Sequence, residues 1–139
     1  AGARGLMQLM PATAKATADK LGLPFDYDRL TSDPAYNVML GSAFFAQLLD
    51  SFGGNHVLAV AAYNAGPGNV RKWIRANGDP RDPGADVIDW IERIPLSETR
   101  GYVQRVLENA VVYDGLNPDG GVMPAQNRLS AYLGKNTPG

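Results

Sequence analysis

The side chains of this chain that could take part in chemistry are carboxyl, amide and phenol groups. The 139 residues include no cysteine and a single histidine, His56. The absence of cysteine excludes a thiolate nucleophile and a disulfide framework, and a single histidine excludes any site that needs several histidine ligands. Proton transfer by a carboxyl group, and hydrogen bonding by amides and phenols, are therefore the chemistry that remains.

The three glutamates differ in their surroundings, and none has those of a general acid. Cleavage of a glycosidic bond needs a carboxylic acid that stays protonated near neutral pH, and burial against apolar walls is the usual means. Glu92 and Glu108 have charged neighbours, which is typical of a solvated helix face. Glu98 follows Ser97 at a predicted helix start, where the helix dipole lowers the pKa of a carboxyl group. A functional Glu98 would therefore be an ionised hydrogen-bond acceptor and a poor proton donor.

Three segments carry groups suited to a sugar, which proteins bind through aromatic faces and through amide and carboxylate hydrogen bonds. The first segment, Gly-Leu-Met-Gln-Leu-Met-Pro, places Gln8 among large apolar residues before a predicted helix. The second, Ala-Ala-Tyr-Asn-Ala-Gly-Pro-Gly, places Tyr63 and Asn64 at the end of an apolar helix. The third contains Glu98 and Tyr102, which are four residues apart and so share one helix face.

Each segment also has a purely structural explanation. Gln8 could face the core and be hydrogen-bonded internally. Tyr63 and Asn64 could be an aromatic at the core edge and a helix C-cap. Glu98 and Tyr102 could be a local side-chain pair with no catalytic role. Local sequence leaves both explanations open for all three segments.

The elements that must position these segments are a succession of helices. Proline at position 11 and the Asp33-Pro34 pair are typical helix starts, and Ser97 is a predicted cap. The segment 56–65 is apolar nearly all round, so we expect it in the middle of the fold. A short strand is possible only over residues 6–10. The predicted helices cover 11–21, 34–52, 56–65, a segment through Trp73, a short segment through Trp90, and 97 to about 114.

These elements predict an all-α domain of five to seven helices in a loosely orthogonal array, since short helices and tight turns disfavour an up-down bundle. We expect this domain over residues 1–116 and a tail or linker over 117–139. Hydrophobic residues make up 45% of the chain, charged residues 19%, and the net charge is −1. This composition is that of a globular protein, and the lack of a basic cluster argues against a nucleic-acid partner.

Taken together, the three segments resemble the goose-type-lysozyme-like catalytic domain of the soluble lytic transglycosylases. The match lies in their order and spacing, it covers roughly residues 2 to 115, and its third run extends from Ile94 to Val103. The resemblance implies a lysozyme-like α fold. It also implies a lyase that cleaves the β-1,4 bond between N-acetylmuramic acid and N-acetylglucosamine in peptidoglycan and leaves a 1,6-anhydromuramyl end.

The resemblance also implies the partner and cellular location of the protein and the roles of individual residues. Peptidoglycan strands are the expected partner, in the periplasm or cell envelope, with no metal or other cofactor. We expect a monomer, with room for other domains in the parent chain. The glycines of the first two segments, Gly5, Gly66 and Gly68, would be architectural. The implied substrate-binding residues are Gln8, Met10, Tyr63, Asn64, Glu98 and Tyr102.

The family's general acid and base is one glutamate, in a Glu-Ser motif on the helix that precedes the first segment. We expect that glutamate upstream of Ala1, which leaves no catalytic residue in this chain and predicts that the chain alone is inactive. Two alternatives stay open. One is a non-catalytic peptidoglycan-binding module, and the other is a lysozyme-type muramidase whose products carry reducing ends.

Overall fold

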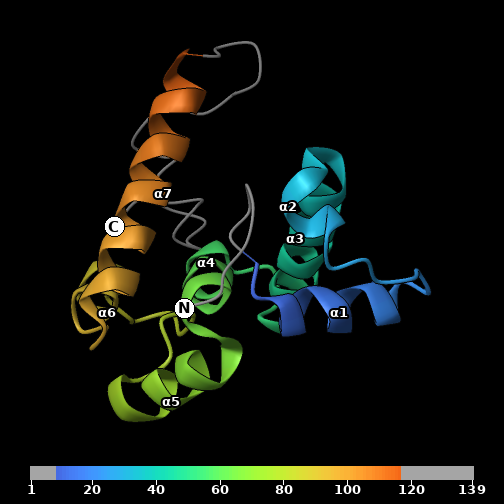
Figure 1. The fold of residues 1–139 in the computed structure, drawn as a ribbon. Coiled ribbons are helices and arrows are strands. Elements are labelled where there is room, and N and C mark those ends of the chain that lie inside the picture. Colours follow the sequence, from blue (N-terminus) through green and yellow to red (C-terminus); the bar gives the residue numbers. More distant parts are fainter. Residues whose placement is uncertain (1–8, 117–139) are drawn as a thin grey trace. The chain divides into compact units, whose positions relative to one another are not determined.

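The computed structural model describes residues 9–116, with side chains described to residue 110. Within these residues the prediction of an all-α fold is confirmed, because no strand element occurs and helices account for the regular structure (Figure 1). The described helices are α1 (Pro11–Lys20), α2 (Arg29–Ser32), α3 (Pro34–Ser51), α4 (His56–Ala65), α5 (Pro67–Asn77), α6 (Val87–Glu92) and α7 (Ser97–Leu116).

Two predicted features fall wholly or partly outside the described residues. The tail over 117–139 does so entirely. Of the strand candidate over 6–10, only the last two residues are described: Leu9 forms one isolated β-bridge, and Met10 is extended and precedes α1. None of the helices in the described part of the chain combines the length and the hydropathy needed to cross a bilayer.

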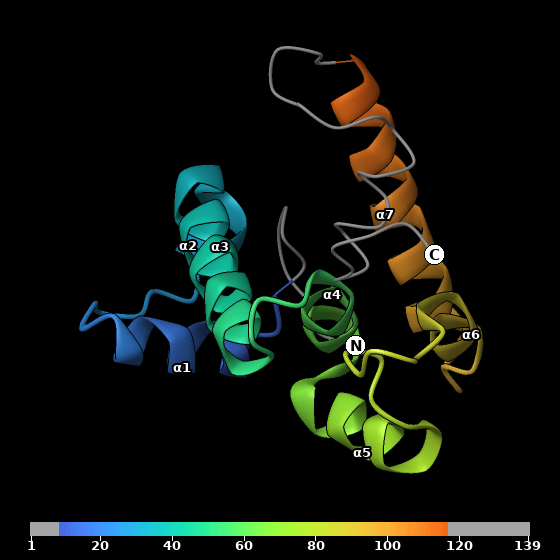
Figure 2. The same ribbon diagram turned by 180° about the vertical axis from the view of Figure 1, so that it is seen from behind.

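The chain divides into two compact units, Ala1–Asp50 and Ser51–Gly139, and each is described by itself. The N-terminal unit contains α1, α2 and nearly all of α3, which can be followed in Figures 1 and 2. Its long helix α3 starts as the sequence predicts, because the Asp33 carboxylate accepts a hydrogen bond from the backbone N–H of Tyr36 at 3.2 Å. A second hydrogen bond, from the Arg29 side chain, is the main reason why the pKa of Asp33 lies below its usual value.

Polar contacts fix the rotation of α3 in the N-terminal unit. Tyr36 and Leu40 are buried, and Asn37 Nδ2 donates to the backbone carbonyl of Leu30 at 2.9 Å. Val38, the residue after Asn37, is apolar but 37% exposed. The hydrogen bond of Asn37 helps to select the buried face of α3, and hydropathy alone does not record it. The sequence also missed α2, since four residues are too few to show a helical period.

Helix α4 is the centre of the C-terminal unit, as its apolar sequence predicts. It packs against both α5 and α7, and five consecutive or near-consecutive side chains of α4 are fully buried. Asn55 caps the helix by accepting a hydrogen bond from the backbone N–H of Leu58 at 2.9 Å. Gly66 ends it with a φ of 94°, a conformation that favours glycine. The fully buried side chains are Val57, Leu58, Ala59, Ala61 and Ala62.

Helix α7 begins at Ser97, the first residue of its predicted range. The carbonyl of Leu96 accepts from the backbone N–H of Arg100 at 3.0 Å, so Leu96 occupies the cap position. Ser97 is therefore the first helical residue, and its predicted role as the cap is wrong. Glu98 remains in the first turn of the helix. Buried side chains recur along α7 at intervals of four residues, at Thr99, Val103 and Leu107.

We expect loss of the Asn55 cap to destabilise the C-terminal unit. In Asn55→Ala the N–H groups of the first turn of α4 lose an acceptor, which should lower the free energy of unfolding by about 1 kcal/mol. Urea denaturation of the chain measures this loss. Asn55→Asp keeps the acceptor oxygen and is the matched control. Equal losses in the two variants would contradict capping as the cause.

Candidate functional site

The C-terminal end of α4 and the first turns of α7 bring together side chains from two of the three sequence segments. The Thr99 hydroxyl of α7 donates to Oδ1 of Asn64 on α4, with 2.6 Å between the two oxygens. These residues are 35 positions apart in the sequence, so the contact is made by the packing of the two helices. Thr99 is 1% exposed, whereas Asn64 is exposed.

Two partly buried phenols belong to the same pair of helices, Tyr63 on α4 and Tyr102 on α7. Burial raises the pKa of Tyr63 to about 12, and the neighbouring Tyr102 adds to this effect. Burial likewise raises the pKa of Tyr102, while the Arg105 guanidinium acts in the opposite direction. Both phenols are therefore neutral at physiological pH, where each can donate a hydrogen bond.

Glu98 lies in the first turn of α7 with its side chain exposed. It is four residues before Tyr102, but among the described residues no hydrogen bond joins these two side chains. The Glu98 carboxylate is therefore neither buried nor hydrogen-bonded to Tyr102. This exposed position differs from the apolar pocket that a general acid needs.

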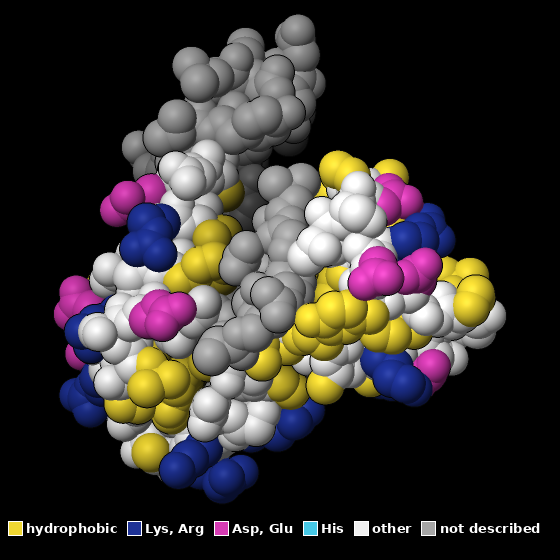
Figure 3. Space-filling model, viewed as in Figure 1, with side chains coloured by type: hydrophobic (Ala, Val, Ile, Leu, Met, Phe, Trp, Pro, Cys, Tyr) yellow, Lys and Arg dark blue, Asp and Glu magenta, His cyan; other side chains and the backbone are white. Residues whose placement is uncertain are grey.

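The structure unites only part of the predicted set of site residues. Tyr63, Asn64 and Tyr102 come together in the C-terminal unit, with Glu98 on the adjacent turn of α7. Gln8 lies outside the described residues. Met10 belongs to the N-terminal unit, where its side chain is 43% exposed. Other apolar side chains are also exposed on the face of the N-terminal unit that Figure 3 shows.

Thr99 is the residue that sequence reasoning missed. The helical spacing of the sequence does indicate that Thr99 is buried. It lies four residues before Val103 and eight before Leu107, on the face of α7 that carries the buried side chains. A hydroxyl on a buried helix face needs a hydrogen-bond partner. Its burial could therefore have been predicted, but its partner, Asn64, becomes known only from the packing of α4 on α7.

The two glycines after Asn64 have different reasons to be glycine. Gly66 has a positive φ, so a side chain there would strain the backbone. Gly68 lies in the first turn of α5 without a positive φ. A methyl group added to either glycine would meet no atom of the described residues within 4 Å. The architectural role expected for Gly66 therefore has a physical basis, whereas neither φ nor crowding explains Gly68.

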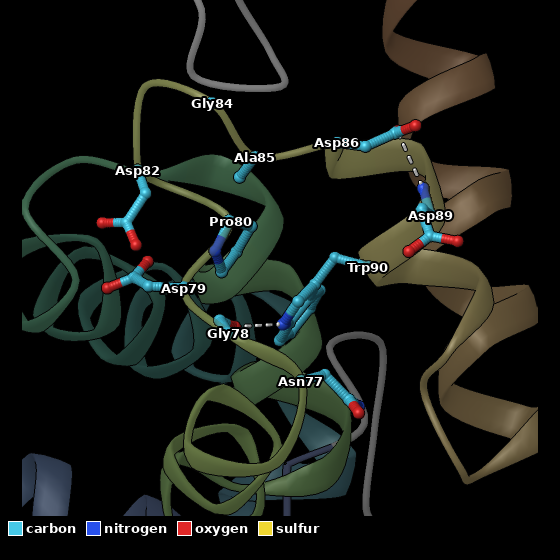
Figure 4. Close-up of a pocket in the computed structure, with 10 residues that line it drawn as sticks. All are labelled: Asn77, Gly78, Asp79, Pro80, Asp82, Gly84, Ala85, Asp86, Asp89 and Trp90. Atoms are coloured by element: carbon cyan, nitrogen blue, oxygen red, sulfur yellow. Dashed lines mark hydrogen bonds between the residues drawn. The ribbon is translucent and has the colours of Figure 1, made fainter.

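A separate pocket of about 320 Å³ lies between the loop after α5 and the start of α6 (Figure 4). Its carboxylates already have partners: Asp79 is paired with Arg81 at 2.8 Å, and Asp86 caps α6 by accepting from the N–H of Asp89 at 3.0 Å. Trp90 Nε1 donates to the carbonyl of Gly78 at 2.9 Å and closes the base of the loop. These contacts stabilise the loop, and the pocket shares no residue with the cluster on α4 and α7.

The family model of the transglycosylase SLT domain matches residues 1–83, more than half of the chain. This chain belongs to that family. The resemblance seen in the three segments is thereby confirmed. The matched range includes Tyr63 and Asn64, and it ends before α7.

Individual relatives extend the similarity of this SLT domain beyond the family model. The soluble lytic murein transglycosylase of Escherichia coli K12 is 41% identical over 113 residues, which is 81% of this chain and 17% of that protein. An inactive glutamate-to-glutamine mutant of the lytic transglycosylase Slt from Pseudomonas aeruginosa has 48% identity and a TM-score of 0.70, over 81% of this chain and 18% of that one.

A third relative is the 70-kDa soluble lytic transglycosylase, whose structure was solved in complex with bulgecin A. It has 39% identity and a TM-score of 0.74, over 83% of this chain and 18% of that one. These structural matches confirm the fold that the resemblance implies. The SLT domain described here thus spans less than a fifth of the length of these relatives.

The pKa of Tyr63 predicts how stability changes at alkaline pH. Because its pKa of about 12 exceeds the value near 10 of an unfolded tyrosine, the folded state keeps the proton that the unfolded state loses. The stability linked to Tyr63 is therefore complete below pH ~10 and is lost as the pH rises towards 12. In Tyr63→Phe, the free energy of unfolding should fall less between about pH 9 and about pH 11 than it does in the wild type.

Tyr27→Phe is the control for this measurement, because Tyr27 is 50% exposed. Its decrease over the same pH interval should equal that of the wild type. If Tyr63→Phe also lost as much stability as the wild type, burial of Tyr63 would not be the source of the effect.

Proposed function

We propose that this SLT domain is part of a lytic transglycosylase that acts on the glycan strands of peptidoglycan. The enzyme would cleave the β-1,4 bond between N-acetylmuramic acid and N-acetylglucosamine and leave a 1,6-anhydromuramyl end. The observation that carries this proposal is the family match over residues 1–83, and the relatives named above are themselves lytic transglycosylases.

The reaction needs one carboxyl group that acts first as an acid and then as a base. The acid protonates the leaving glycosidic oxygen, and the 6-hydroxyl of the muramic acid then attacks C1 while its proton passes to the same carboxylate. This route needs no water as nucleophile and no second carboxylate. The glutamate-to-glutamine mutant of the Pseudomonas aeruginosa relative is described as inactive, which supports a single essential glutamate. We place the corresponding glutamate of this protein upstream of Ala1.

The residues of this chain would bind and orient the glycan beside that acid. Neutral Tyr63 and Tyr102 can donate hydrogen bonds and offer aromatic surface, and the amide of Asn64 can pair with a sugar acetamido group. Exposed Glu98 would accept hydrogen bonds from sugar hydroxyls. We also assign Gln8 and Met10, from the first segment, to contacts with the glycan.

The proposal also covers the partner, location and oligomeric state of the enzyme. Peptidoglycan strands are its partner, and it works in the periplasm or cell envelope as a monomer, without a metal or other cofactor. The relatives are much longer than this chain, which covers 17% of the Escherichia coli protein. Their length is consistent with further domains in the parent protein.

Product analysis tests the proposed reaction. The full-length protein, incubated with purified murein sacculi, should release muropeptides with 1,6-anhydromuramyl ends, which mass spectrometry distinguishes from reducing ends by the mass of one water. Changing the upstream glutamate to glutamine should abolish release, and residues 1–139 alone should release none. Reducing ends would instead identify a muramidase, and binding without cleavage a non-catalytic module.

Glu98→Gln tests the role assigned to Glu98. Because an acceptor of a charge-assisted hydrogen bond is lost, kcat/KM of the full-length protein should fall roughly 10- to 100-fold. The pH profile of kcat should keep its shape. Glu92→Gln, on an exposed position of α6, is the matched control and should leave kcat/KM unchanged. A change in the basic limb of the Glu98→Gln profile would show that Glu98 itself donates the proton.

A further inference from the structure

Thr99 occupies a buried position where a hydroxyl is costly unless it has a partner. Its side chain is 1% exposed, in the first turn of α7, and its partner is Oδ1 of Asn64 at 2.6 Å. Burial thus holds the donor in place, while the acceptor belongs to an exposed side chain at the far end of another helix. A fixed donor of this kind can set the orientation of the group that it contacts.

The two ends of the Asn64 amide have opposite hydrogen-bonding character, since the oxygen only accepts and the NH2 group only donates. The bond from Thr99 engages the oxygen, so the NH2 group is the part of this exposed side chain that can donate to a ligand. We propose that Thr99 is a positioning residue that holds the Asn64 amide with its NH2 group towards the glycan. This inference rests on the function proposed above, and it names the acceptor as a carbonyl or hydroxyl oxygen of the sugar.

The surroundings of Asn64 explain why such a constraint has an effect. An exposed amide without a fixed partner can rotate and present either its oxygen or its nitrogen. In the molecules that present the oxygen, two acceptors would face each other, because a sugar carbonyl also only accepts. Thr99 is β-branched, which restricts its own side-chain rotation. Tyr63 precedes Asn64 in the last turn of α4, and its neutral phenol is a second hydrogen-bond donor at this end of the helix.

Removal of the Thr99 hydroxyl is the first test, in the full-length protein acting on soluble glycan strands. Thr99→Val keeps the branched shape, and kcat/KM should fall roughly five- to tenfold, the value of one hydrogen bond. The change should lie mainly in KM, because the contact is made in both the bound and the transition state. Thr99→Ser keeps the hydroxyl and should restore the wild-type value.

Thr17→Val is the matched control for this substitution. Thr17 is 2% exposed and belongs to α1, and its hydroxyl donates within that helix to the carbonyl of Thr13 at 2.9 Å. The same change at Thr17 therefore removes a buried hydroxyl without touching Asn64, and kcat/KM should stay at the wild-type value. Thermal unfolding of each variant shows whether it is folded, and Thr99→Ala replaces Thr99→Val if the latter fails to fold.

A double-mutant cycle tests whether Thr99 acts through Asn64. In an Asn64→Ala background, Thr99→Val should cause no further loss of kcat/KM, because the group that it orients is absent. Asn64→Asp keeps an acceptor for Thr99 but replaces the NH2 group by oxygen, and it should bind the glycan as poorly as Asn64→Ala. Additive losses in the cycle, or full activity of Asn64→Asp, would overturn the positioning role.

The outcomes separate this inference from the proposed function. If the wild-type protein forms no anhydromuramyl ends, the proposed function fails, and the role of Thr99 fails with it. If the wild type forms them and Thr99→Val has the same kcat and KM as the wild type, the reaction stands and only the positioning role is overturned.

Discussion

Burial of α4 is the constraint on which the C-terminal unit depends. Its side chains are apolar on nearly every face, and Val57 and Leu58 are completely buried. Burying one such side chain contributes about 1.5–3 kcal/mol, so the helix is stable only when neighbours cover it on several sides. Helices α5 and α7 provide that cover. The same packing brings the last turn of α4 against the first turn of α7, and this is how Asn64 meets Thr99.

The residues at the two ends of α4 determine where this helix starts and stops. Asn55 stops the helix from extending backwards by capping its first turn, and Gly66 stops it at the other end with a backbone conformation that favours glycine. Pro67 then starts α5 at once. Because both ends are fixed, Tyr63 and Asn64 occupy the last turn of a helix that cannot slide or lengthen. A buried helix thus serves as a rigid support for two polar side chains.

The candidate site is built from groups that are neutral or exposed. Burial keeps Tyr63 and Tyr102 protonated, and Glu98 lies on the surface of the first turn of α7. Such a set can hold a neutral, polar ligand through hydrogen bonds without the cost of burying a charge. It does not contain a carboxyl group in an apolar pocket. The function proposed above accordingly assigns these residues to glycan binding and the acid to a glutamate outside them.

The sequence by itself determined the helical class, the burial of α4 and the family, because these depend on local pattern or on the order of short motifs. It placed Ser97 at a cap, and this was wrong, since the Leu96 carbonyl accepts the hydrogen bond that begins α7. Only the tertiary structure showed that Asn64 and Thr99 are bonded. Their contact joins residues 35 positions apart, and it arises from the way two helices pack, which no local pattern encodes.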